Sequence, residues 1–296
     1  MMPIRLLALD LDGTLLNSGG RLSDRNRSAV AMAIEAGVSV AIVTGRRFRD
    51  ARPLALQLGL DVPVISHNGA LTKHAATLET VRALLLPQEA AREVVDAGRE
   101  FGGDALVSDD PSGSGLLVYD NISEGNLALA KYIEWSQRVV GDGAKEAVRR
   151  VPTLQKYLDH DPIHISFSGS CRSMAHLAAM LRERFGQRIQ VLCTIYPKQD
   201  FTLVDILNPA ASKGAGLEAV AAELSVSSEE TMAIGDNEND IEMLRFADTG
   251  VVMANAGHEL TECPDFHKTA TNDEDGVALA IERFILRPAG KARPIE

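Results

Sequence analysis

Short apolar runs alternate with amphipathic segments over the first third of the chain. Residues 4–9 and 38–43 are nearly continuous apolar runs, which are typical of strands buried on both faces. Between these runs, Ser23 is placed to cap a helix that would end at Gly37. A third strand is expected at residues 63–66, after a second helix. This alternation of strands and helices predicts a parallel sheet with helices on both faces.

The last third of the chain repeats this pattern. A helix is expected to begin at Lys213, and strands are expected at residues 231–234 and 250–253. A helix at residues 239–247 would connect these two strands, and an amphipathic helix at residues 275–286 would follow them. The two outer thirds therefore predict parts of one α/β domain.

The middle of the chain has a different pattern. Residues 84–201 mix helices with short strands, and these strands lack the carboxylate-bearing ends of the outer strands. Chain ends that share one pattern around a middle with another predict a domain inserted into a domain. We expect a discontinuous core domain of residues 1–83 and 202–286, with a cap domain of residues 84–201. Residues 287–296, rich in proline, glycine and basic side chains, are expected to form a disordered tail.

The composition narrows the classes of partner. A formal net charge of −11 argues against nucleic acid or an anionic membrane as the main partner. Three widely spaced cysteines show neither a metal-ligand spacing nor a disulfide framework, which favours a reducing compartment. No signal peptide and no membrane span are expected, because no long uncharged apolar stretch is present. The chain is therefore expected to be cytoplasmic, and its oligomeric state is not predicted.

Polar residues follow four of the expected strands. They are, in chain order, Asp10 and Asp12, Thr44 and Gly45, residues 66–69, and residues 235–240. Parallel neighbours in one sheet would bring these four strand ends to the same edge. In open α/β sheets that edge is where ligands bind.

Carboxylates at that edge suit a magnesium ion. Asp10, Asp236 and Asp240 offer hard oxygen ligands, which Mg²⁺ prefers, and no cluster of histidine and cysteine favours a softer metal. Lys213 is the natural counter-charge, because a cation at a helix N-terminus is otherwise disfavoured. A carboxylate nucleophile, a metal ion, a lysine, a hydroxyl and backbone amides are the groups that phosphoryl transfer requires.

Several of these residues also have a structural interpretation. Asp240 is placed to favour the positive end of the following helix, and Thr44 to cap the helix after it. Lys213 could be a solvated lysine at a helix start. Arg46 is equally open between a role at the site and a surface or cap contact.

The motifs, taken in order, resemble those of a known superfamily. Four are similar to motifs of the haloacid dehalogenase-like hydrolases: Asp-Leu-Asp-Gly-Thr-Leu-Leu at 10–16, Thr-Gly-Arg at 44–46, Lys-Gly at 213–214 and Gly-Asp-Asn-Glu-Asn-Asp at 235–240. Three features resemble the Cof-type sugar-phosphatase branch: Ser-His-Asn-Gly-Ala at 66–70, Asn-Asp-Glu-Asp-Gly-Val at 272–277, and the long insert before Lys213. The resemblance implies an α/β fold, with a Rossmann-like parallel core sheet and an inserted mixed α/β cap of the C2 type.

The resemblance also implies catalytic and metal-binding roles. Asp10 would be the nucleophile that forms an aspartyl-phosphate. Asp12 would protonate the leaving alcohol and then activate water. The backbone carbonyl of Asp12 and the carboxylates of Asp10 and Asp236 would hold Mg²⁺, and Asp240 would support the metal through water or from outside its ligand shell.

Four further residues would contact the substrate. By the same resemblance, Thr44, Gly45 and Lys213 would bind the phosphoryl group, and Asn239 would reach the same oxygens or the substrate. The expected function is Mg²⁺-dependent hydrolysis of a small phosphorylated metabolite, such as a sugar phosphate. Asp12 favours hydrolysis, because leaving-group protonation and water activation both need a proton carrier. Two alternatives stay open: a phosphomutase of the same superfamily, and a non-catalytic sensor of Mg²⁺ or of a phosphorylated metabolite.

Overall fold

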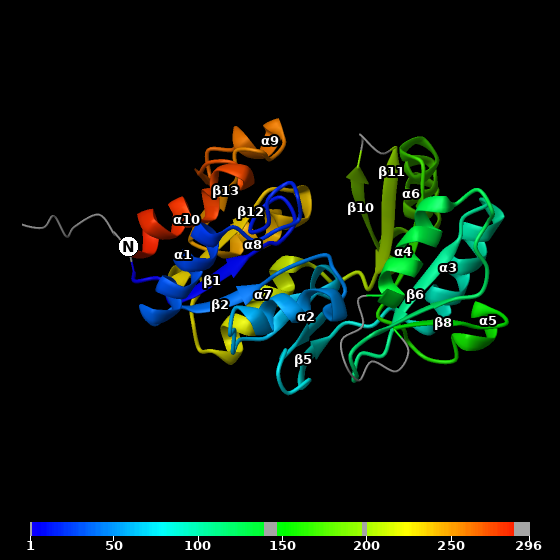
Figure 1. Ribbon diagram of the computed structural model, residues 1–296. Coiled ribbons are helices and arrows are strands. Elements are labelled where there is room, and N and C mark those ends of the chain that lie inside the picture. The colour runs from blue at the N-terminus through cyan, green and yellow to red at the C-terminus, as the bar shows by residue number, and fades with distance from the viewer. Residues whose placement is uncertain (1, 139–146, 197–199, 287–296) are drawn as a thin grey trace, which may run out of the picture. The chain divides into compact units, whose positions relative to one another are not determined.

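The chain forms two compact units in a computed structural model that describes residues 2–138, 147–196 and 200–286 (Figure 1). The first unit contains the chain up to Arg46, Ala51–Arg82, and the chain from Ser212 onward; the second contains Arg47–Asp50 and Ala83–Ala211. The domain boundaries that we place at 83/84 and 201/202 stay predictions. The predicted tail at 287–296 lies outside the described residues.

A five-stranded parallel sheet forms the centre of the first unit. Its order is β14-β13-β12-β1-β2. The strands are β1 (Leu6–Leu9), β2 (Ser39–Ile42), β12 (Thr231–Gly235), β13 (Thr249–Val252) and β14 (His267–Lys268). All four residues of β1 are buried, because the strand has neighbours on both sides and helices over both faces. This burial is what the continuous apolar run predicts.

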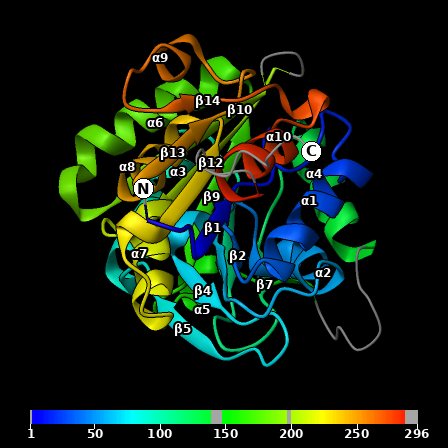
Figure 2. The same ribbon diagram turned by 90° about the vertical axis from the view of Figure 1, so that its left-hand side faces the viewer.

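Helices cover the two faces of this sheet (Figure 2). On one face, α7 and α8 contribute Leu217 and Met243 to a buried cluster with Leu6 of β1. On the other face, α1 packs against α10. The helices of the first unit are α1 (Asp24–Glu35), α7 (Lys213–Glu223), α8 (Ile241–Phe246), α9 (His258–Thr261), α10 (Gly276–Ile281) and, running across the unit boundary, α2 (Phe48–Gln57).

The ends of α1 are those expected from the sequence. The backbone N–H of Asn26 donates to Ser23 Oγ at 3.1 Å, which makes Ser23 the N-cap. The chain leaves the helix through Gly37, whose φ of +87° is in the left-handed region.

The third strand differs from the sequence-based prediction. We expect residues 63–66 to extend the parallel sheet, but β3 (Val64–Ser66) belongs to a separate three-stranded sheet with β4 (Leu71–Lys73) and β5 (Thr80–Ala83). The reason is the turn His67–Gly69, which reverses the chain so that β4 pairs antiparallel with β3. A single parallel bridge between Val43 and Ile65 still connects β3 to the end of β2.

The second unit is built on a six-stranded mixed sheet. Its order is β10-β11-β9-β6-β7-β8; β7 and β8 pair in parallel, and the other described neighbours pair antiparallel. The strands are β6 (Ala105–Asp109), β7 (Leu116–Tyr119), β8 (Val148–Arg150), β9 (His164–Gly169), β10 (Gln190–Tyr196) and β11 (Phe201–Leu207). The helices are α3 (Gln88–Glu100), α4 (Leu127–Arg138), α5 (Leu154–Tyr157) and α6 (Cys171–Phe185).

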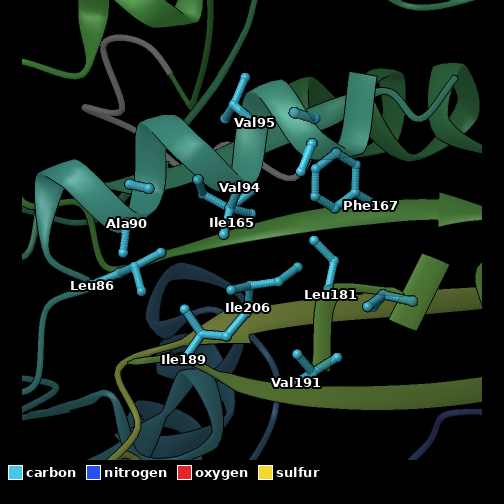
Figure 3. Close-up of a cluster of buried hydrophobic side chains, with 14 of the residues drawn as sticks. Leu86, Ala90, Val94, Val95, Ile165, Phe167, Leu181, Ile189, Val191 and Ile206 are labelled. Carbon is cyan, nitrogen blue, oxygen red and sulfur yellow. The ribbon is translucent and has the colours of Figure 1, made fainter. Parts of the chain in front are cut away.

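The two faces of this mixed sheet differ in chemistry. On one face, Val94 of α3 and Leu181 of α6 pack with Phe167 and Ile206 of the strands (Figure 3). His164 and the other alternate residues of β9 are polar and buried on the opposite face, because side chains alternate along a strand. A parallel core sheet with helices on both faces and a separate mixed α/β sheet confirm the predicted fold class. Within the described part of the chain, no helix is both long and apolar enough to cross a membrane.

Candidate active site

The expected carboxylates lie at the carboxyl edge of the parallel sheet. β1 and β12 are neighbours in register, with Leu9 opposite Ile234, so Asp10 and Asp236 leave adjacent strand ends. The backbone N–H of Asp10 donates to the carbonyl oxygen of Ile234 at 3.1 Å, which continues this pairing by one residue. The first unit therefore brings the two motifs together as the sequence predicts.

Lys213 links two of these carboxylates. Its Nζ donates to Asp10 Oδ1 at 2.7 Å and to Asp240 Oδ1 at 2.6 Å. The three side chains are only 2%, 6% and 0% exposed, in the order Lys213, Asp10, Asp240. Lys213 is the first residue of α7, and Ser212 caps this helix. The backbone therefore fixes the position from which the lysine side chain extends. The interpretation of Lys213 as a solvated lysine is therefore wrong.

The charges at this edge do not balance among themselves. One ligand oxygen from each of Asp10, Asp236 and Asp240 lies within 4.8 Å of the others, and Lys213 forms ion pairs with Asp10 and Asp240. Burial raises the pKa of Asp10 well above its ordinary value; Lys213 opposes that shift, and Asp240 and Asp236 reinforce it. Burial and then Asp240 raise the pKa of Asp236 to about 6. Burial lowers the pKa of Lys213, but the carboxylates of Asp10 and Asp240 raise it more, so the lysine stays charged.

This donor set fits a divalent cation. The oxygens are hard, Asp10 and Asp240 are buried and Asp236 is half-buried, and their excess negative charge is of the kind that Mg²⁺ neutralises. Asp236 is oriented for such a role by Thr14, whose Oγ1 donates to Asp236 Oδ1 at 3.0 Å. Asn255 adds a second donor: its Nδ2 bonds the carbonyl oxygen of Gly13 at 2.8 Å and Asp236 Oδ2 at 3.3 Å. Our sequence reasoning missed Thr14 and Asn255.

Gly13 is required where the chain passes Asp236. Its φ is +84°, a conformation that side chains rarely adopt. A Cβ at this position would lie 2.2 Å from Asp236 Oδ2, so any larger residue would displace that carboxylate. The glycine of the first motif thus allows two strand ends to approach closely.

Asp240 uses both of its carboxylate oxygens. Oδ1 accepts from Lys213, and Oδ2 accepts from the backbone N–H groups of Asp236 and Asn237, both at 3.0 Å. The residue holds the lysine and also shapes the loop that carries Asp236. Its two interpretations from the sequence, site residue and helix-start residue, are therefore compatible.

A tight turn holds the polar residues that follow β2. The N–H of His67 donates to the carbonyl oxygen of Arg46 at 2.9 Å, and the N–H of Asn68 donates to that of Thr44 at 3.1 Å. Thr44 is buried, and its Oγ1 accepts from the N–H of Arg46 at 3.1 Å. Because that oxygen accepts, its own O–H is able to donate to a phosphoryl oxygen.

Asn239 reaches this turn from the other side of the site. Its Nδ2 donates to Asn68 Oδ1 at 2.9 Å, and the Asn68 amide lies against Gly45. Within the described residues, Asn239 Oδ1 is buried without a hydrogen-bond partner. Asn68 is a site residue that we did not select, although it lies within the 66–70 motif. The structure thus brings Thr44, Gly45 and Asn239 together around one side chain.

Asp12 lies apart from the buried cluster. Its side chain is 55% exposed, and both of its oxygens accept hydrogen bonds from Arg46: Nε to Oδ2 at 2.8 Å and Nη2 to Oδ1 at 2.6 Å. The exposed carboxylate of Asp12 is therefore held in place by a two-point contact with Arg46.

The fold and the position of the polar residues define an α/β protein with a candidate active site at the carboxyl edge of a parallel sheet. A model of the haloacid dehalogenase-like hydrolases matches residues 7–281, and the chain belongs to that family. The predicted Cof-type branch is confirmed, as is the prediction of a phosphoric monoester hydrolase.

Similar proteins match along nearly the whole chain. The putative phosphatase YxeH of Bacillus subtilis (strain 168) is 29% identical over 293 residues, which cover 95% of this chain and 98% of YxeH. The 5-amino-6-(5-phospho-D-ribitylamino)uracil phosphatase YitU of the same organism is 27% identical over 283 residues, covering 94% of this chain and 97% of YitU. The crystal structure of a haloacid dehalogenase-like hydrolase from Bacteroides thetaiotaomicron superposes with a TM-score of 0.78 at 26% identity, covering 94% of this chain and 98% of that chain.

Proposed function

We propose that this protein is a Mg²⁺-dependent phosphatase that hydrolyses a small phosphorylated metabolite through an aspartyl-phosphate. The observation that carries the proposal is the buried ammonium of Lys213 between Asp10 and Asp240, with Asp236 beside them. Such a cluster combines a nucleophilic carboxylate with positive charge for the phosphoryl oxygens.

In the first step, an oxygen of Asp10 bonds to the phosphorus while the bond to the leaving alcohol breaks. Asp12 gives its proton to the departing oxygen. In the second step, Asp12 takes a proton from water as the water oxygen attacks the phosphorus of the aspartyl-phosphate. The bond from phosphorus to Asp10 then breaks, and inorganic phosphate is released with both aspartates in their starting states.

The phosphoryl group would be bound by residues around the same edge. Lys213 would donate from its ammonium, Thr44 from its hydroxyl and Gly45 from its backbone N–H. Asn239 is held near Thr44 and Gly45 by its hydrogen bond to Asn68. These groups orient the phosphorus for in-line attack and spread its negative charge over several donors.

The carboxylates of Asp10 and Asp236 and the backbone carbonyl of Asp12 would hold Mg²⁺. When bound, Mg²⁺ offsets the negative charge of the carboxylates and of the phosphoryl oxygens. Asp240 would support the site from outside the ligand shell, because Lys213 and two backbone N–H groups already occupy its oxygens.

Phosphate esters of small metabolites, sugar phosphates among them, are the substrates that we propose. YitU is named as a phosphatase of 5-amino-6-(5-phospho-D-ribitylamino)uracil, and the chain matches that relative over nearly its full length. A cytoplasmic location fits such substrates and is part of the proposal.

Phosphate release from a panel of phosphorylated metabolites, with Mg²⁺ or with EDTA, tests this function. We expect Mg²⁺-dependent release that Asp10→Asn lowers by roughly three orders of magnitude or more, because the covalent step is lost. Asp61→Asn is the matched control, since Asp61 is exposed in the same unit and outside the site. Near-normal turnover in Asp10→Asn would refute the assignment of Asp10 as the nucleophile. Release that appears only with a bisphosphate activator would instead identify a mutase.

A further inference from the structure

Arg46 makes a two-point contact with the carboxylate that is expected to transfer protons. Its Nε and Nη2 donate to the two oxygens of Asp12 at 2.8 and 2.6 Å. A planar guanidinium that bonds both oxygens fixes the plane and the direction of a carboxylate, as a single bond or a point charge does not. Without this contact, a side chain as exposed as Asp12 would sample several rotamers.

The backbone of Arg46 is itself held in place. Its N–H donates to Thr44 Oγ1 at 3.1 Å, and its carbonyl oxygen accepts from the N–H of His67 at 2.9 Å. His67 has a φ of +50°, an uncommon conformation for a residue other than glycine. The turn after β3 therefore holds the backbone of Arg46 in place, and the guanidinium of Arg46 in turn holds the carboxylate of Asp12, which follows β1.

The contact has little value for the stability of the fold. Ion pairs at this degree of exposure contribute at most about 1 kcal/mol. Its geometry, by contrast, is specific, and it joins two strand ends at the proposed site.

We propose that Arg46 is a positioning residue for proton transfer by Asp12. This inference rests on the proposed function, in which Asp12 protonates the leaving alcohol. Arg46 acts by aiming the Asp12 carboxylate and does not bind the phosphoryl group. A misplacement of a proton donor by about 1 Å can lower a rate by about 100-fold.

The test compares two leaving groups. We would measure kcat/KM for the best alkyl phosphate of the panel and for p-nitrophenyl phosphate, because kcat/KM reports the steps up to departure of the leaving group. An alkoxide needs a proton as it departs, whereas the acidic p-nitrophenol does not. For Arg46→Gln we expect kcat/KM to fall by about 10- to 100-fold with the alkyl ester and by less than about threefold with the aryl ester.

A double mutant shows whether Arg46 acts through Asp12. Asp12→Asn should show the same selective loss with the alkyl ester, and adding Arg46→Gln to it should lower kcat/KM by less than about twofold further. Arg25→Gln is the matched control, since it removes an exposed arginine that pairs with Glu282. We expect it to leave both kcat/KM values and the melting temperature unchanged.

Three results would overturn the inference. An equal fall with both esters would make Arg46 a phosphate-binding residue, an unchanged alkyl-ester rate would remove any role, and additive losses in the double mutant would separate Arg46 from Asp12. The same assays on Asp10→Asn distinguish a failure of the proposed function. If Asp10→Asn keeps its turnover, the function itself fails; if it is inactive and Arg46→Gln gives one of the three results, only the positioning role fails.

Discussion

Replacing Lys213 by methionine removes the one ammonium that two buried carboxylates share. Methionine keeps most of the length of the side chain and removes its charge. Removing one partner of a buried ion pair costs about 3–5 kcal/mol, because the other charge is left buried without compensation. Here Asp10 and Asp240 lose the same partner, and both are almost fully buried. We therefore expect Lys213→Met to lose about 3–5 kcal/mol of unfolding free energy at pH 8.

The loss should depend on pH, and its sign follows from the pKa of Asp10. Burial already raises that pKa well above its ordinary value, and Lys213 is the group that opposes the rise. Without the lysine, the pKa of Asp10 moves further upward in the folded protein. A carboxyl with a raised folded-state pKa stabilises the fold at low pH and loses that contribution as pH rises through the folded pKa. The deficit of Lys213→Met should therefore be larger at pH 8 than at pH 6.

The assay is urea unfolding followed by far-ultraviolet circular dichroism at both pH values, in EDTA. Lys268→Met is the matched control, because Lys268 pairs with Glu262 at 3.0 Å but both side chains are more than half exposed. That variant should lose less than about 1 kcal/mol at either pH. The reasoning is refuted if Lys213→Met is as stable as Lys268→Met, or if its deficit is the same at pH 6 and pH 8.

Two further predictions concern a proposed metal ligand, Asp236, and the turn after β3. The pKa of Asp236, raised by burial and by Asp240 to about 6, means that Mg²⁺ must displace a proton at acidic pH. Titration calorimetry should show the affinity for Mg²⁺ falling by up to about tenfold per unit below pH 6, and an affinity that is flat from pH 5 to 7 would contradict this. Gly69→Ala should lose more than about 2 kcal/mol, because Gly69 has a φ of +89° and its added Cβ would lie 1.9 Å from the carbonyl oxygen of Ser212. Gly37→Ala, with a φ of +87° and nothing within 4 Å of its added Cβ, should lose only about 1–2 kcal/mol in thermal or urea unfolding, and equal losses in the two variants would argue against the close approach.

Four strands of the parallel sheet could be predicted because local sequence and tertiary environment agree there, whereas the two-residue strand β14 was not predicted. β1 is buried on both faces, and its apolar run carries that information within four residues. β3 is just as buried, but its partner is decided by the turn that follows it. Two positive φ values at residues other than glycine, His67 and Asn68, are needed for that turn. Our patterns did not predict such a backbone, and so we placed β3 in the wrong sheet.

Within the candidate site, too, some residues could be found from the local sequence, whereas others have roles that depend on contacts between distant segments. The strand-end rule placed Asp10 and Asp236 correctly, because register in a parallel sheet converts sequence position into spatial position. Thr14 and Asn255 were missed because their role depends on where Asp236 lies. Asn255 follows β13, and the same rule applied to that strand end would have found it. Arg46 stayed open because sequence spacing does not determine which carboxylate a long flexible side chain reaches.

The turn His67–Gly69 contacts three segments of the candidate site, and these contacts compensate for its strained backbone. The N–H groups of its first two residues donate to the carbonyl oxygens of Arg46 and Thr44, and its second side chain accepts from Asn239. Its third residue lies so close to the carbonyl oxygen of Ser212 that only glycine fits. Residues held in a sparsely populated backbone region cost about 1–3 kcal/mol each and persist where the surroundings over-determine them. Two of those surrounding residues, Thr44 and Asn239, are proposed to bind the phosphoryl group, so changes that relax the turn should stabilise the fold only by loosening these two donors.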